Sequence, residues 1–164
     1  MTEHEMKELV VRQRTYFETG ATLPVTLRIT ALRKLYSAIS ANENAIHDAL
    51  KKDLGKSGFE SYMCETGLVL EEISYMLKHI RQFAREKRVH TPLSQFHSRS
   101  FQKPSPYGVV LIMSPWNYPF LLTLSPLADA LAAGNTAIVK PSAYSPYTSA
   151  ILQKILSQCF DPQY

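Results

Sequence analysis

Polar groups that suit ligand chemistry lie inside an unusually apolar stretch of the chain. Asp129 is the only ionisable acidic or basic residue between Lys103 and Lys140. Asn117 offers a neutral amide donor in a loop that two flanking prolines restrict. Such a donor can stabilise a developing oxyanion without supplying a proton, which is worth about 3 kcal/mol of barrier. A structural role, in which Asn117 caps the following helix, explains its presence equally well.

Two further side chains near this loop have binding chemistry of their own. Trp116 could form the wall of a site for a planar ligand, although a single tryptophan more often packs in a core. Lys140 could donate charged hydrogen bonds to ribose hydroxyls or a phosphate. A solvated lysine at the end of a strand is the alternative. The sequence shows no metal-binding cluster and no phosphate-loop glycine pattern.

The elements that would position these residues can be read from apolar patterning. The β-branched run 109–113 predicts a strand buried on both faces. Helical spacing over 120–133 predicts a helix that ends at Gly134 and that Pro126 should kink or split. Residues 136–140 predict a second strand of the first kind.

Ser145 and Pro146 then predict the N-cap and first position of another helix, which completes a β-α-β-α order. Two parallel strands joined by a helix present their carboxyl ends at one edge of the sheet, where ligands of α/β proteins bind. We therefore expect the loop of Trp116 and Asn117 to share a site with Lys140.

Two spaced strings carry a family resemblance. The strings YGVVLIMSPWNYPF at 107–120 and LADALAAGNTAIVKPS at 127–142 resemble the aldehyde dehydrogenase superfamily, and 70–87 is similar to its dimeric, class 3-like branch. The resemblance implies an α/β fold in which long N-terminal helices precede a β-α-β-α part of a Rossmann-like NAD(P)-binding domain. It also implies NAD(P)-dependent oxidation of an aldehyde to a carboxylic acid through a cysteine thiohemiacetal and thioester.

The same resemblance assigns roles to individual residues. Asn117 would be the oxyanion amide. The cofactor would be NAD or NADP, and no metal is implied. The residues implied to contact the cofactor, in the cleft and beside the adenosine ribose, are Ser114, Pro115, Trp116, Lys140, Ser142 and Ala143.

Ala143 departs from the family pattern. Many family members have glutamate there, and that carboxylate accepts hydrogen bonds from ribose hydroxyls while repelling a 2′-phosphate. Alanine removes the repulsion, so the resemblance predicts an intact enzyme that accepts NADP as well as NAD, with Lys140 attracting the extra phosphate.

The resemblance also divides the chain into parts. Residues 1–90 would form a helical layer of the cofactor domain, 91–106 the start of bridging strands at a homodimer interface, and 107–164 the first part of the NAD(P)-binding domain. Cys64 and Cys159 fall on predicted helices outside the context of the family nucleophile. We therefore expect an N-terminal fragment that lacks the catalytic domain and is inactive alone.

Periodicity predicts helices throughout the first half. The expected helices are 3–18, ended by Gly20, a single long helix from Pro24 to Gly55, and a third from Phe59 that packs antiparallel to the second. Residues 94–101 alternate weakly, which is compatible with an exposed strand.

The net charge of +4 and the basic cluster at 81–88 leave an alternative, a non-catalytic helical module that binds nucleic acid or another partner. Acidic residues are interspersed through the rest of the chain, and aromatic residues do not interleave the basic run as stacking platforms, which favours the enzyme. The sequence shows no signal peptide and no clean apolar run of about 20 residues. We therefore expect a cytoplasmic protein with reduced thiols, no membrane association and no nucleic-acid partner.

Overall fold

The computed structural model describes residues 2–164. Seven α-helices, one π-helical and one 3-10 segment, and four short strands make up this part of the chain. In chain order they are α1 (Glu3–Glu18), α2 (Val25–Ala41), α3 (Glu43–Leu54), α4 (Gly58–Ser61), η1 (Tyr62–Thr66), α5 (Gly67–Phe83), β1 (Lys87–Val89), η2 (Leu93–Gln95), β2 (Ser100–Gln102), β3 (Val109–Met113), α6 (Leu121–Ala133), β4 (Thr136–Lys140) and α7 (Pro146–Cys159).

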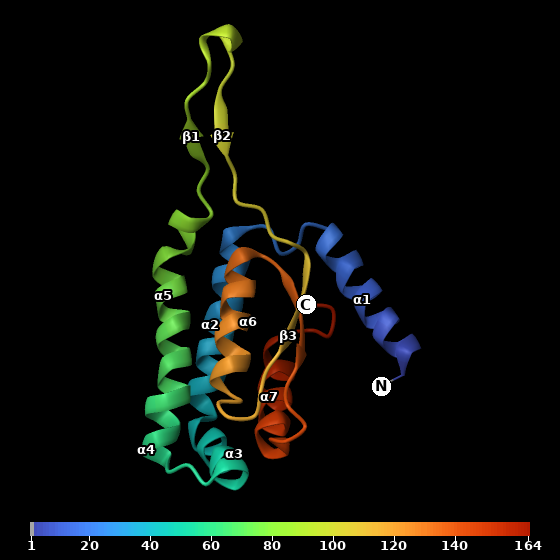
Figure 1. Ribbon diagram of the computed structural model, residues 1–164, viewed down its shortest axis with the longest axis vertical. Coiled ribbons are helices and arrows are strands. Elements are labelled where there is room, and N and C mark those ends of the chain that lie inside the picture. The colour runs from blue at the N-terminus through green and yellow to red at the C-terminus, as the bar shows by residue number, and fades with distance from the viewer. Residues whose placement is uncertain (1) are drawn as a thin grey trace.

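The core lies between the long helices. Helices α2, α5 and α6 contact one another and stand side by side, with α2 and α5 running in opposite directions (Figure 1). The antiparallel packing expected for the helices of the first half is thus confirmed. The side chains buried between the helices are mainly aliphatic, and include Leu32, Leu35, Ile39, Val69, Ile73, Ile80, Leu124, Leu131, Leu152 and Ile155.

The prediction of one helix from Pro24 to Gly55 is wrong, because the chain breaks at Asn42. Asn42 has φ −111° and ψ 15°, outside the helical region, and separates α2 from α3. Its side-chain amide donates to the Ala38 carbonyl at 2.8 Å, so it ends α2. Asparagine competes with helical backbone bonds in this way. The predicted end of α3 is confirmed, with Gly55 at φ 70°.

A helical rod runs from Gly58 to Phe83, close to the predicted start at Phe59, but it is not uniform. Its segment η1 is π-helical, and the backbone N–H of Gly67 bonds to the Tyr62 carbonyl. A Cβ at Gly67 would lie 2.8 Å from that oxygen, so the close approach of the two backbone segments requires glycine. Widened turns of this kind occur often at functional sites.

The central pair of strands follows the predicted order. Strands β3 and β4 pair in parallel, from Val109 opposite Thr136 to Met113 opposite Lys140, and α6 connects them. Pro126 lies inside α6 without splitting it. Gly134 ends α6 at φ 91°, as expected.

The expectation that both strands are buried on both faces is wrong for β3 in this structure. Ile112 is buried, whereas Leu111 is 60% and Met113 68% exposed. Helix α6 contacts both strands and covers one face, and α1 also contacts both strands. Alternate side chains of a strand point to opposite faces, so one covered face leaves every second residue open.

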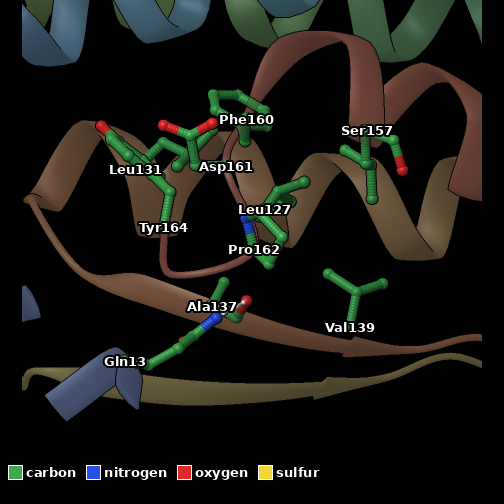
Figure 2. Close-up of a pocket in the computed structure, with 11 residues that line it drawn as sticks. Gln13, Leu127, Leu131, Ala137, Val139, Ser157, Phe160, Asp161, Pro162 and Tyr164 are labelled. Carbon is green, nitrogen blue, oxygen red and sulfur yellow. Dashed lines mark hydrogen bonds between the residues drawn. The ribbon is translucent and has the colours of Figure 1, made fainter. Parts of the chain in front are cut away.

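The outer edge of β4 is only partly occupied. The amide of Ala137 donates to the Tyr164 carbonyl at 3.2 Å, and the Gln13 side chain donates to the Ala137 carbonyl at 3.1 Å. A mostly apolar cavity of about 330 Å³ lies beside this edge, below α6 and the end of α7 (Figure 2). Leu127, Val139 and Phe160 contribute to its wall.

A two-stranded hairpin projects from the helical body beyond the end of α5 (Figure 1). Strands β1 and β2 pair antiparallel, with Arg88 opposite Phe101. The prediction of an exposed strand over 94–101 is therefore wrong for most of that range, because only 100–102 is strand and 93–95 forms a 3-10 turn. His97, at φ 81°, lies in the turn of the hairpin. No helix within residues 2–164 is long and apolar enough to span a bilayer.

Candidate functional site

The two loops predicted to share a site leave the sheet side by side. Met113 and Lys140 are register partners at the carboxyl ends of β3 and β4. One residue further on, the Ser114 amide donates to the Lys140 carbonyl at 3.3 Å. The loop of Trp116 and Asn117 thus begins next to the loop that follows Lys140. This is the sheet edge at which α/β proteins bind ligands.

Ser114 faces the protein interior at this edge. It is buried, and its hydroxyl lies 2.6 Å from the Thr123 hydroxyl, which itself donates to the Pro119 carbonyl. Because the single Thr123 hydrogen is used by Pro119, the Ser114 hydroxyl donates to Thr123. Ser114 therefore ties the end of β3 to the first turn of α6.

Asn117 is exposed, and so are Pro115 and Trp116, whose side chain is 53% exposed. The alternative that Asn117 caps α6 is wrong, because the first amides of that helix, at Phe120 and Leu121, donate to Glu65 instead. Across residues 2–164 the Asn117 carboxamide is not engaged in any hydrogen bond shown by the structure. It is available to a ligand.

Two charged residues that the sequence analysis missed support this loop. Glu65, in η1, is completely buried and accepts from the Phe120 and Leu121 amides at 2.8 and 3.1 Å. Lys56, which is also buried, forms an ion pair with Glu65 and donates to the Asn117 carbonyl at 3.2 Å. The sequence held one signal for this supporting role: Glu65 is a carboxylate among the mostly apolar side chains on the buried side of the helix predicted from Phe59.

The second loop carries the predicted ribose contacts. Lys140 and Ala143 are exposed, and Ser142 is buried. The Ser142 hydroxyl accepts from the Tyr144 amide at 3.2 Å, and its carbonyl accepts from the Ser149 hydroxyl at 3.0 Å, which folds the loop onto α7. Ser142 and Ala143 line a groove of about 580 Å³ along α7. The structure thus brings Ser142 and Ala143 together and leaves Lys140 at the exposed end of β4.

Ser145 occupies the N-cap position of α7, and Pro146 follows it as predicted, but the Ser145 side chain makes no cap bond. Asp53 of α3 takes that role. Its carboxylate accepts from the Tyr147 amide at 3.2 Å, and from the amide and hydroxyl of Thr148 at 2.6 and 2.7 Å. The predicted N-cap position of Ser145 is therefore confirmed, but the capping hydrogen bonds come from a carboxylate of a packed neighbouring helix and not from the serine hydroxyl.

The cysteines lie on helical segments, as predicted. Burial raises the pKa of the Cys159 thiol, so the thiol remains protonated at neutral pH. It lies 3.7 Å from the Lys34 carbonyl, to which it donates. Cys64 belongs to η1 and is partly exposed. Nowhere in residues 2–164 do three or more His, Cys, Asp or Glu side chains gather as a metal site.

The sequence model of the aldehyde dehydrogenase family matches residues 1–163. The chain belongs to the aldehyde dehydrogenase family. It is 40% identical over 151 residues to 4,4'-diaponeurosporen-aldehyde dehydrogenase of Staphylococcus aureus, covering 92% of this chain and 33% of that protein. It is 39% identical over 150 residues to human aldehyde dehydrogenase family 3 member B1, covering 92% of this chain and 32% of that protein. The resemblance to the class 3 branch is thereby confirmed.

A solved structure agrees with this placement. The substrate-bound AldH of Staphylococcus aureus superimposes with a TM-score of 0.94 at 38% identity, over 97% of this chain and 35% of that one. The expected α/β fold, with helices before a β-α-β-α unit, is confirmed as that of this family. The chain spans about a third of the length of the curated relatives it matches.

Proposed function

We propose that this chain serves the NAD(P)-dependent oxidation of an aldehyde to a carboxylic acid. The observation that carries the proposal is the parallel pairing of β3 and β4, which starts the Asn117 loop and the Lys140 loop at one sheet edge. Membership of the aldehyde dehydrogenase family supports it.

Asn117 has the chemistry for one step of this reaction. When a cysteine thiolate attacks the aldehyde, negative charge develops on the carbonyl oxygen, and an amide donor stabilises that charge without transferring a proton. The Asn117 carboxamide is exposed while its backbone is held, as an oxyanion donor should be. NAD or NADP, when bound in the neighbouring cleft, would supply the acceptor for the hydride that the oxidation releases, and water would release the carboxylic acid from the enzyme.

The loop after β4 fits the ribose end of a nucleotide. The groove beside Ser142 and Ala143 offers space along α7, and Lys140, two residues before Ser142, is exposed at the end of β4. Pro115 and Trp116, on the neighbouring loop, are exposed at the same edge and suit the cofactor cleft. Ser114 would contribute to cofactor binding indirectly, because its hydrogen bond to Thr123 fixes the start of that loop.

Substitution of Asn117 tests the catalytic role. Asn117→Ala should lower kcat by about 100-fold to 1,000-fold, because one oxyanion donor is worth that much, and should leave the KM for the cofactor nearly unchanged. Steady-state kinetics of the intact enzyme measure both kcat and the KM for the cofactor. A variant that raises the cofactor KM and keeps kcat would show that Asn117 serves binding instead.

Ala143 bears on the choice of cofactor. We propose that the enzyme uses NADP as well as NAD, because no carboxylate at position 143 repels a 2′-phosphate, and exposed Lys140 can attract it. Kinetics with both cofactors, for the wild type and for Ala143→Glu, test this. Strict NAD preference that Ala143→Glu does not alter would contradict it.

The remaining parts have proposed roles in the assembled enzyme. Residues 1–90 would be the helical layer of the cofactor domain, 91–106 would begin the bridging strands of a homodimer, and 107–164 the first part of the NAD(P)-binding domain. The projecting hairpin of β1 and β2 suits such a bridge (Figure 1). We propose a cytoplasmic homodimer without nucleic-acid or membrane partners, which sedimentation and cell fractionation can test.

A further inference from the structure

A buried ion pair holds the backbone beside Asn117. Glu65 is completely buried, and its two carboxylate oxygens have different partners: one faces Lys56, and the other accepts from the amides of Phe120 and Leu121 at 2.8 and 3.1 Å. The first amides of a helix have no partner within the helix, so Glu65 fixes the start of α6.

Lys56 extends this support to Asn117 itself. Its ammonium donates to the Asn117 carbonyl at 3.2 Å and lies 4.1 Å from the centroid of the Tyr118 ring. Within residues 2–164, the ion pair, hydrogen bonds and ring contact of the ammonium are thus with Glu65 and with the Asn117–Tyr118 segment of the loop. The Asn117 backbone is anchored on one side by Lys56 and, three residues later, by the capped amide of Phe120.

The location of Glu65 also indicates a role beyond packing. Glu65 belongs to the π-helical segment η1, which departs from regular helix directly under the start of α6. Buried ion pairs give little net stability compared with apolar residues of similar size. Because the Lys56–Glu65 pair gives little net stability and contacts the loop of Asn117, we infer that its role is to order that loop.

We propose that Lys56 and Glu65 are positioning residues that hold the Asn117 carboxamide for the aldehyde oxygen. This inference rests on the proposed function. Neither residue touches the substrate; both act through the backbone of the loop. An oxyanion donor must lie about 2.7–3.1 Å from the developing charge, and a misplacement of about 1 Å can reduce the rate about 100-fold.

Four variants separate positioning from folding. Lys56→Met and Glu65→Gln each leave one buried charge without its partner and are expected to destabilise the protein. The double variant removes both charges and keeps an amide oxygen that can accept from Phe120, so it should fold better than either single variant. Lys52→Met is the matched control, because Lys52 also lies over a tyrosine ring, that of Tyr147 at 5.3 Å, but is exposed.

The first readout is the order of the loop. Trp116 is the only tryptophan, so its fluorescence anisotropy reports the loop next to Asn117. In the double variant we expect lower Trp116 anisotropy and about tenfold faster hydrogen exchange at Phe120 and Leu121, without a change in the buried amides of α2 and α5. Lys52→Met should match the wild type. Wild-type anisotropy and exchange in the double variant would overturn the proposal.

The second readout is aldehyde turnover by the intact enzyme, with the wild-type sequence and with the double substitution. We expect kcat to fall between about 10-fold and 100-fold while the cofactor KM stays within about twofold. An active wild type and a double variant with unchanged kcat would overturn the positioning role and leave the proposed function standing. An intact wild-type enzyme without aldehyde turnover would count against the proposed function, and the loop measurements would still decide whether Lys56 and Glu65 order Asn117.

Discussion

Replacing Asp53 with alanine should destabilise the protein by about 2 kcal/mol, although Asp53 lies far from α7 in sequence. Asp53 accepts three hydrogen bonds from Tyr147 and Thr148, the shortest at 2.6 Å. Loss of a helix cap costs about 0.5–2 kcal/mol, and hydrogen bonds to a charged group contribute about 1.5–3 kcal/mol. Asp53 is only partly buried, so water can reach the freed amides and the loss stays at about 2 kcal/mol, where these two ranges overlap.

Urea unfolding followed by far-UV circular dichroism measures this loss, and thermal unfolding should show a decrease of roughly 4–8 °C in Tm for a chain of this size. Ser145→Ala is the matched control. The Ser145 hydroxyl makes only a 3.4 Å bond to the Ser142 carbonyl, so its removal should cost less than about 1 kcal/mol. If Ser145→Ala costs more than Asp53→Ala, then the serine and not Asp53 caps α7.

Two further substitutions test other parts of the structure. Gly134→Ala should cost about 2–4 kcal/mol in urea unfolding, because φ is 91° and the added Cβ would lie 2.7 Å from the Arg28 guanidinium; a loss below about 1 kcal/mol would contradict this. Partial burial and neighbouring Glu72 raise the pKa of Asp129 from 3.8 to about 6. The folded state then binds more protons than the unfolded state between these values, so stability falls as pH rises through them. The fall is modest because Asp129 is only partly buried and water screens its charge. Asp129→Asn should flatten the fall, and an unchanged pH profile would refute the assignment.

Local signals were sufficient to predict the β-α-β-α unit. Runs such as 109–113 and 136–140 combine β-branched residues with flanking proline or glycine, and Gly134 ends α6 where a positive φ is needed. The break at Asn42 was missed because the apolar stripe continues on both sides of it, from Ile39 to Ile46. Periodicity reports which side of a helix is buried, and two consecutive helices can share one pattern.

The site was predicted only in part, for a related reason. Topology placed Asn117 and Lys140 at one edge, since parallel strands end together. The residues that hold the two loops, Lys56, Glu65 and Asp53, lie in the N-terminal helices, and Glu65 is 55 positions from the Phe120 amide it binds. In the sequence they resemble ordinary helix charges. Their role arises from tertiary packing, which spacing along the chain does not report.

These supports also determine which part of a nucleotide the edge can accept. The positive ends of helices commonly bind phosphate. Here Glu65 takes the first amides of α6, and Asp53 takes those of α7. A phosphate at either helix end would have to displace the carboxylate or lie in contact with it, and two negative charges in contact repel each other. The pyrophosphate of a dinucleotide must therefore find its donors elsewhere in the protein. What this edge offers is the ammonium of Lys140 and the groove along α7, which suit a ribose and its substituents better than a chain of phosphates.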